Sequence, residues 1–325
     1  MAHLGAYYYL WYDKDQWDRW KSIHTPRIGF YDSSSQDVIT QHITWAKMYG
    51  IKFFVVGWAG PGSKADQNLK NAFLVNPHSH DIQFAILYET EARLKDSPSD
   101  VMNLDDQRKA NRLIDDLSYC ATQYFDDERY FKLDGRPILV LYLSRDLTGN
   151  VEAVIQKLRA ALARHNPYII GDEVYWGRLT RDLLRRPRLS DLDARRIRSY
   201  DAVTAYNMHT SSRKILDSFE KDVANEFSDW AQALSQIGVD LVPSAIPGFN
   251  DTKILERRNI PLQRSVERFN RQLQAATKPP TRYQLVLITS FNEWHEDTQI
   301  EPAVDYGPQE VDRVSYLDTA RRYGG

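Results

Sequence analysis

Residues 285–296 read LVLITSFNEWHE, an apolar, β-branched run that turns abruptly polar and aromatic. The first half has the pattern of a buried strand. The second half carries two carboxylates, Glu293 and Glu296, with a tryptophan and a histidine between them. A strand that ends in acids and aromatic residues is typical of a barrel enzyme at the face where its active site begins.

Seven more strand-like runs precede this one, and most are separated by segments with helical spacing. The predicted strands are residues 5–12, 51–58, 82–89, 138–143, 168–172, 202–207 and 239–251, the last taken together with its loop. The predicted helices include residues 36–49, 66–75, 151–164, 219–237 and 264–276, and a basic helical excursion is expected over 177–199. Buried strands joined by helices indicate a parallel sheet, and eight such units predict a single-domain (β/α)8 TIM barrel over residues 1–325. An open doubly wound sheet is the alternative, disfavoured because no glycine-rich phosphate turn follows the first strand.

Composition narrows the classes of partner. The formal net charge of -2 argues against a general attraction to nucleic acid or to an anionic membrane, and the basic clusters 185–188 and 195–198 are interpreted as solvated surface. Cys120 is the only cysteine, which excludes an intrachain disulfide. No apolar run approaches the ~20 residues of a membrane span. We expect a monomer without membrane insertion, cytoplasmic as the chain stands and periplasmic or secreted if a signal peptide was removed.

Acids and aromatic residues dominate the predicted carboxyl ends of the strands, which meet at one face of a barrel. Before the last strand they are Tyr9, Trp11, Tyr12, Trp58, Tyr88, Glu89, Asp172, Tyr206, Asn207, Asn250 and Asp251. Aromatic faces suit the apolar C–H faces of sugar rings. No metal-ligand spacing, nucleophile elbow or phosphate loop appears, so no cofactor is expected.

Carboxylate pairs flanked by aromatic residues are used in glycoside hydrolysis, where one acid protonates the leaving oxygen and the other assists the oxocarbenium-like centre. Neighbouring like charges separate the two pKa values, which supplies an acid and a base from identical side chains. Other interpretations stay open. Glu293 and Glu296 could lie on a solvated turn, Glu89 could form a structural ion pair, and the Tyr206 hydroxyl could be tied into the barrel rim.

Residues 290–302, SFNEWHEDTQIEP, resemble the signature of glycoside hydrolase family 99, the endo-α-1,2-mannosidases and endomannanases, and of the family-99-like domains. Weaker supporting segments occur in the same order along nearly the whole chain. They are residues 8–12, 29–33, 45–47, 55–62, 87–90, 134–137 and 247–252.

The resemblance implies a metal-independent (β/α)8 barrel that cleaves internal α-mannosidic bonds of an oligosaccharide or polysaccharide with retention. It implies that Glu296 is the general acid and that Glu293 deprotonates the sugar's own 2-hydroxyl, which then forms a 1,2-anhydro sugar. Water opens this intermediate with Glu296 as base. The predicted substrate-binding residues are Tyr9, Trp11, Trp58, Glu89, Tyr206, Asn292, Trp294 and His295. Which tyrosine of the first strand faces the site stays open, because alternate residues point to opposite faces.

One position departs from the family pattern, since Ala59 stands where a second aromatic residue is common. The resemblance therefore predicts the mechanism but does not fix the identity of the substrate. Three hypotheses follow: an endo-acting α-mannosidase, a glycosidase of the same mechanism on another bacterial polysaccharide with a free 2-hydroxyl, and a non-catalytic carbohydrate-binding or polysaccharide-assembly barrel.

Overall fold

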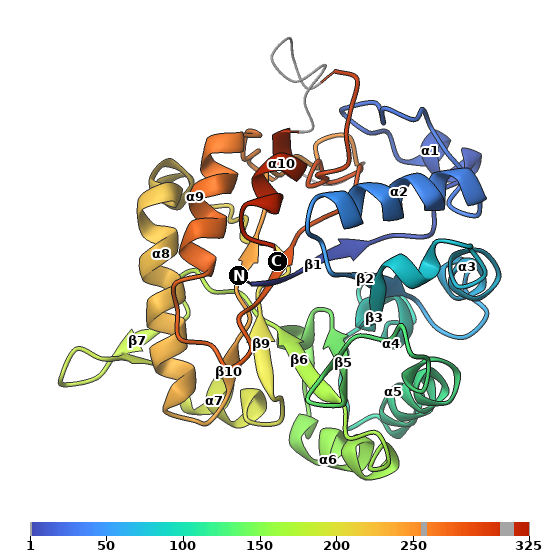
Figure 1. The fold of residues 1–325 in the computed structure, drawn as a ribbon. Coiled ribbons are helices and arrows are strands. Elements are labelled where there is room, and N and C mark those ends of the chain that lie inside the picture. The colour runs from blue at the N-terminus through green and yellow to red at the C-terminus, as the bar shows by residue number, and fades with distance from the viewer. Residues whose placement is uncertain (1, 255–258, 306–314, 325) are drawn as a thin grey trace.

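The computed structural model describes residues 2–254, 259–305 and 315–324, and its centre is a barrel of parallel strands (Figure 1). In sheet order the strands run β10-β9-β6-β5-β3-β2-β1-β12-β11. Their bounds are β1 (His3–Tyr8), β2 (Phe53–Trp58), β3 (Gln83–Tyr88), β5 (Arg136–Leu141), β6 (Tyr168–Asp172), β9 (Ala202–Thr204), β10 (Asp240–Leu241), β11 (Ser244–Ala245) and β12 (Leu285–Ile288). A short strand, β4 (Lys132–Leu133), pairs antiparallel with β5.

The strands β10 and β11 are two halves of the seventh barrel strand, separated by Val242 and Pro243. Proline lacks the N–H that a strand donates, which interrupts the pairing there. Backbone hydrogen bonds still cross the gap, from Val242 N to Val203 O at 2.8 Å and from Leu287 N to Pro243 O at 3.0 Å. Because β10 pairs with β9, β11 with β12 and β12 with β1, the sheet closes. The prediction of a (β/α)8 barrel is confirmed.

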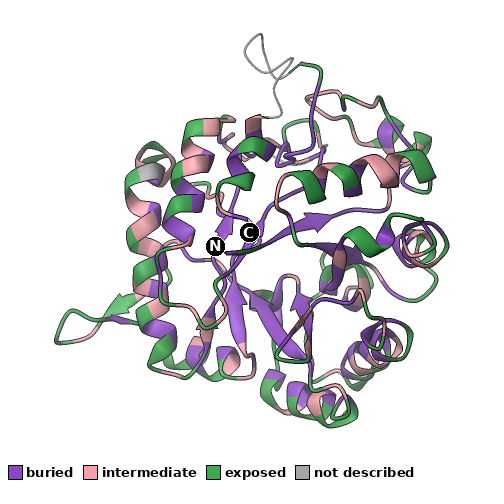
Figure 2. Ribbon diagram, viewed as in Figure 1, coloured by how far each residue is buried: buried purple, intermediate pink, exposed green. Residues whose placement is uncertain are grey.

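Helices cover the outside of the barrel, with their buried faces toward the strands and their exposed faces toward solvent (Figure 2). Their bounds are α1 (Lys14–Arg19), α2 (Gln36–Met48), α3 (Lys64–Asn68), α4 (Thr90–Leu94), α5 (Gln107–Cys120), α6 (Val151–Ala161), α7 (Asp191–Ile197), α8 (Arg213–Ser235), α9 (Val266–Ala276) and α10 (Ser315–Arg321). Within the described ranges no helix is long and apolar enough to cross a membrane.

Helix α9 shows how the sequence sets these elements. The Ser265 hydroxyl accepts a hydrogen bond from Arg268 N at 3.1 Å and so caps the first turn. Phe269, Leu273 and Ala276 are buried at positions i, i+4 and i+7, which places one apolar stripe against the barrel. The helix begins two residues later than predicted and ends at the predicted residue.

The predicted helical excursion over 177–199 is helical only in α7. Before it, β7 (Thr180–Arg181) and β8 (Pro187–Arg188) form an antiparallel hairpin. The Asp182 carboxylate accepts hydrogen bonds from Leu184 N at 2.9 Å and Arg186 N at 2.8 Å, and Arg185 has a left-handed φ of 60°. This local turn competes with a helix in the way short acidic side chains often do.

The consecutive tyrosines of the first strand point alternately to opposite faces of the sheet, as side chains in a strand do. Tyr8 points outward, where its ring stacks on Phe54 at 4.2 Å and its hydroxyl meets His42 Nδ1 at 3.0 Å. The Tyr7 ring lies 4.7 Å from the Tyr206 ring, and Tyr9 reaches the cavity described next. The tyrosine that faces the site is therefore Tyr9.

Candidate active site

A cavity of about 260 Å³ lies where the carboxyl ends of the barrel strands converge. Segments that follow β1, β3, β5, β9 and β12 supply most of its wall. The lining residues are Tyr9, Trp11, Trp20, Glu89, Glu91, Ala92, Tyr142, Tyr206, Ile254, Glu293, His295 and Glu296. Among the described residues, the wall combines five aromatic side chains with four carboxyl groups and contains no lysine or arginine.

Seven of the ten residues predicted from the sequence line this cavity. They are Tyr9, Trp11, Glu89, Tyr206, Glu293, His295 and Glu296. The structure places Trp58, Asn292 and Trp294 elsewhere, each fully buried. Trp58 follows the outward alternation of β2, stacks on Tyr119 at 5.9 Å and donates from its indole to Asp66 Oδ1 at 2.9 Å.

Asn292 and Trp294 hold the loop after β12 in place. The Asn292 side chain accepts a hydrogen bond from Tyr9 N at 2.7 Å and donates one to Tyr9 O at 2.9 Å. The Trp294 indole donates to Glu301 Oε2 at 2.8 Å. These bonds tie the end of the first strand to the loop that carries Glu293 and Glu296, so the two carboxylates and Tyr9 keep a fixed relation.

Glu293 is buried, and the surrounding protein offers its carboxyl group few hydrogen-bond donors. Within the described part of the chain, its Oε1 atom accepts two hydrogen bonds, both long, from the Tyr12 hydroxyl at 3.4 Å and from His295 N at 3.3 Å. Burial, and next the charge of Glu296, raise the pKa of Glu293 well above its usual value. Glu296 lies on the same wall and is half-buried.

Glu89 completes a group of three carboxyls around the cavity. Burial, and next the charge of Glu296, raise its pKa to about 8. Gly57 makes room for it, since a Cβ atom there would lie 2.7 Å from the Tyr9 ring and 3.1 Å from Glu89 Oε1. No side-chain hydrogen bond or ion pair of Glu89 occurs in the part of the chain that the structure describes.

Tyr206 and Tyr9 form one edge of the cavity, with their hydroxyl oxygens 2.5 Å apart. The backbone N–H of Tyr206 donates to Asp172 Oδ1 at 2.7 Å, and Asp172 also pairs with Arg145 at 2.6 Å. The Tyr206 hydroxyl is therefore tied to the rim and lines the cavity as well. Asp172, a predicted strand-end acid, holds the backbone beside the site.

His295 presents a neutral imidazole to the cavity. Burial lowers its pKa to about 4, and the ring lies between Tyr12 and Trp20, at centroid distances of 5.2 and 5.3 Å. Neither ring nitrogen has a hydrogen-bond partner among residues 2–254, 259–305 and 315–324. A neutral imidazole can donate one hydrogen bond and accept another, which suits a sugar hydroxyl.

Sequence reasoning missed five lining residues. Tyr142 directly follows β5, so the strand-end rule could have found it. Glu91 and Ala92 lie on the short helix α4 just after Glu89. Trp20 and Ile254 lie in irregular segments, and no pattern in the sequence marks them.

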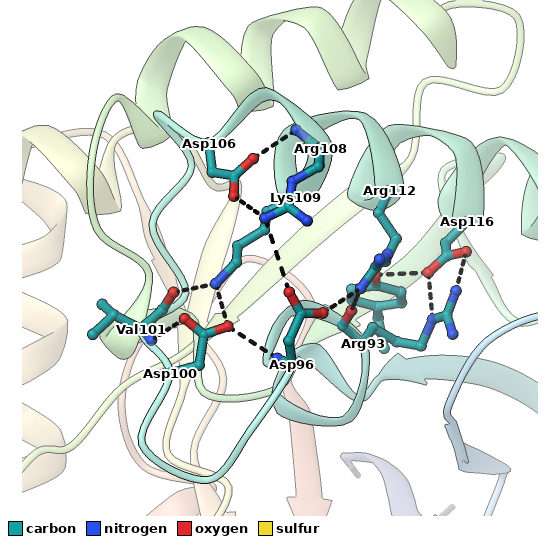
Figure 3. Close-up of polar contacts among 10 residues, drawn as sticks. Arg93, Asp96, Asp100, Val101, Asp106, Arg108, Lys109, Arg112 and Asp116 are labelled. Carbon is teal, nitrogen blue, oxygen red and sulfur yellow. Dashed lines mark hydrogen bonds and ion pairs between the residues drawn. The ribbon is translucent and has the colours of Figure 1, made fainter.

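The wall formed by α4 is braced from behind by ion pairs (Figure 3). Arg93 donates to both oxygens of Asp116 on α5, at 2.7 and 2.9 Å. Lys109 binds Asp100 Oδ2 and Val101 O, both at 2.6 Å. The loop between α4 and α5 is thus attached to α5, which holds Glu89 and Glu91 at the cavity.

In the described residues no group of three or more His, Cys, Asp or Glu side chains could hold a metal ion.

The fold is that of a (β/α)8 barrel with an acidic, aromatic-walled cavity at the carboxyl ends of its strands. A model of the family described as Glycosyltransferase WbsX matches residues 12–314, and the chain belongs to that family. The resemblance to family 99 is confirmed by relatives. The mouse glycoprotein endo-alpha-1,2-mannosidase-like protein is 27% identical over 306 residues, which cover 90% of this chain and 60% of that protein. The chain thus spans about 60% of the length of the first curated relatives it matches.

Two solved structures share the fold. One described as a glycoside hydrolase-like protein has a TM-score of 0.79 and 22% identity, covering 99% of this chain and 94% of that chain. The family 99 endo-alpha-mannosidase from Bacteroides thetaiotaomicron, in complex with bis-tris propane, has a TM-score of 0.70 and 21% identity, covering 99% and 96%.

Proposed function

We propose that the chain is a retaining glycoside hydrolase that cleaves internal bonds of an α-mannoside. The observation that carries the proposal is the convergence of Glu293, Glu296 and Glu89 on one aromatic-walled cavity. The names of the mannosidase relatives and of the family 99 structure support the choice of substrate class. At about 260 Å³ the cavity is smaller than most small-molecule sites, so the rest of a polymer would lie beyond its rim.

In the proposed reaction Glu293 takes the proton of the sugar's 2-hydroxyl, whose oxygen attacks the anomeric carbon. Glu296 gives its proton to the leaving oxygen, and a 1,2-anhydro sugar forms. Water then attacks the anomeric carbon, Glu296 takes the proton of the water, and Glu293 returns its proton to the 2-oxygen. No bond to the enzyme is formed, unlike the usual retaining scheme.

The electrostatics of the cavity support these roles. A sugar hydroxyl is a weak acid, and a carboxylate with a raised pKa is the stronger base for it. Because burial and the charge of Glu296 raise the pKa of Glu293, the two neighbouring carboxyl groups together retain a proton more readily than separate ones would. The proposed roles require that this proton is on Glu296 when the sugar is bound, so that Glu293 can accept the proton of the 2-hydroxyl.

A second candidate is transfer of the sugar to another sugar hydroxyl instead of water. The description of the matching family model, Glycosyltransferase WbsX, favours it. The first half of the reaction is unchanged, and only the acceptor in the second half differs. A glycosidase of the same mechanism on another polysaccharide with a free 2-hydroxyl is a variant of the first candidate.

The test is incubation of the purified chain with α-1,2-mannan, glucosylated mannosides and a panel of bacterial exopolysaccharides, with products identified by mass spectrometry. We expect new reducing ends from hydrolysis, whereas longer products with an added acceptor would indicate transfer. Glu293→Gln and Glu296→Gln should each reduce turnover about 100-fold or more and keep glycan binding. The matched control Glu152→Gln, an exposed carboxyl group on α6 that does not line this cavity, should stay within a few-fold of the parent. Binding without turnover by the unaltered chain would favour a non-catalytic barrel.

A further inference from the structure

The hairpin β7–β8 and its tip project from the body of the molecule beside α8 (Figure 1). At the tip, Leu183 is 104% exposed and Leu184 is 72% exposed. The two adjacent leucines form a small contiguous apolar patch at the end of a projection, and contiguous patches, unlike scattered apolar residues, can mark a contact with a partner or a membrane. The cavity described above uses neither of them.

The tip is held in shape by its own side chains. Asp182 accepts the backbone N–H groups of Leu184 and Arg186 and also pairs with the Arg186 guanidinium at 2.7 Å. The Arg181 guanidinium binds both oxygens of Asp229 on α8. The hairpin is therefore fixed to the barrel and presents its leucines outward.

The segment around the tip is strongly basic. Between Arg178 and Arg198 there are eight arginines and three aspartates, a net charge of +5 in a chain whose formal net charge is -2. Two of these arginines, Arg181 and Arg196, pair with acids outside the segment. The overall charge of -2 hides this segregation. In the described part of the chain, Arg185, Arg195 and Arg198 have no ion-pair partner. Arg195 and Arg198 also line a cavity of about 600 Å³ at the amino-terminal ends of the strands.

We propose that this hairpin attaches the protein to the surface of an anionic lipid bilayer, with Leu183 and Leu184 inserted between headgroups and the arginines against lipid phosphates. Apolar tips flanked by cationic side chains bind such surfaces by combining burial with electrostatic attraction. Two leucines cover far less than the about 800 Å² per partner of a standard protein interface, so a protein partner fits this projection less well. The net charge of the whole chain, -2, is an average that includes this basic segment, so it does not describe the local charge that a membrane surface would meet.

The test is co-sedimentation of the purified chain with vesicles of phosphatidylcholine alone, and with vesicles that contain about 30% phosphatidylglycerol. We expect binding to the anionic vesicles only, and weaker binding as salt rises from about 0.1 M to 0.5 M. Leu183→Ser with Leu184→Ser should reduce the bound fraction about tenfold, and Arg185→Ser should reduce it several-fold. The control, Met48→Ser with Val75→Ser, alters apolar residues exposed elsewhere and should bind as the parent does.

The melting temperature of the leucine double variant should match that of the parent, because those side chains contact solvent. The proposal would be overturned if the parent chain did not bind the anionic vesicles. It would also be overturned if the leucine double variant bound them as well as the parent does. A concentration-dependent dimer on size-exclusion chromatography, abolished by the same double variant, would overturn it in favour of self-association. None of these measurements depends on glycosidase activity.

Discussion

Two groups of buried carboxylates in this barrel have opposite surroundings. Asp66, on α3, accepts hydrogen bonds from the Trp58 indole at 2.9 Å, from Gly62 N at 2.8 Å and from the Tyr124 hydroxyl, and pairs with Lys70 at 2.8 Å. Burial alone would raise its pKa, but these partners hold the pKa of Asp66 below its usual value. Glu293 is also buried but, among the described residues, accepts two long hydrogen bonds and no short one, and its pKa is raised.

The difference in hydrogen-bond and ion-pair partners distinguishes a carboxylate that stabilises the fold from one that is available to a ligand. A buried charge with a complete set of partners stabilises its surroundings and is chemically quiet. A buried carboxyl without such a set is costly to ionise, and folds retain such groups mainly at functional sites. Glu301 belongs with Asp66, since it accepts from Tyr31 and Trp294 and pairs with His42.

The largest effect is expected at Glu293, the buried carboxyl group with few hydrogen-bond partners. Glu293→Gln should reduce turnover by about 100- to 10,000-fold, because a general base is removed. Its melting temperature should be at least that of the parent, because an amide replaces a carboxyl that is costly to ionise there. Steady-state kinetics and thermal unfolding measure the two effects, and a large loss of stability would place Glu293 with Asp66.

Substitution of Asp66, the buried carboxylate with several partners, should have the opposite effect, lowering stability and leaving turnover unchanged. Asp66→Ala removes the acceptor of Lys70, Trp58 and Tyr124 and should cost about 3–5 kcal/mol of unfolding free energy. The fraction that remains folded should keep the kcat of the parent, since Asp66 does not line the cavity. Denaturant unfolding and kcat per folded molecule check this. A variant with normal stability and lost turnover would contradict the comparison.

A smaller effect is expected from the pH dependence of Glu89, whose pKa is raised to about 8. A raised pKa means that the folded state binds more protons than the unfolded state between about pH 4.5 and 8, so stability from this group is lost as pH rises through that window. Glu89→Gln removes this dependence. The melting temperature of the variant minus that of the parent should therefore rise from pH 5 to pH 9. A difference that stays constant over this range would show that Glu89 is not held in its protonated form.

The barrel was predictable because its signals are local and periodic, and the cavity acids were predictable because strand ends converge in a barrel. Side-chain direction was less accessible. Trp58 and Glu89 both lie at strand ends, yet one extends outward to Asp66 and the other inward beside Gly57. Asn292 and Trp294 are in the same loop as Glu293, and only their hydrogen-bond partners, Tyr9 and Glu301, reveal a structural role. Trp20 enters the wall from an irregular segment, where no periodicity exists to read.

The smallest expected effects come from a pair of identical substitutions, Trp58→Phe and Trp11→Phe, one on each side of the comparison. Trp58→Phe removes the indole donor of Asp66 and should cost about 2 kcal/mol of stability with KM unchanged. Trp11 stacks on Tyr9 at 4.3 Å, lines the cavity and has no partner for its buried indole N–H among the described residues. Trp11→Phe should therefore leave stability nearly unchanged and raise KM about fivefold, which corresponds to about 1 kcal/mol of lost substrate binding. Thermal unfolding and KM are measured on both variants, and an exchange of the two outcomes would mean that the outward tryptophan, not the inward one, meets the sugar.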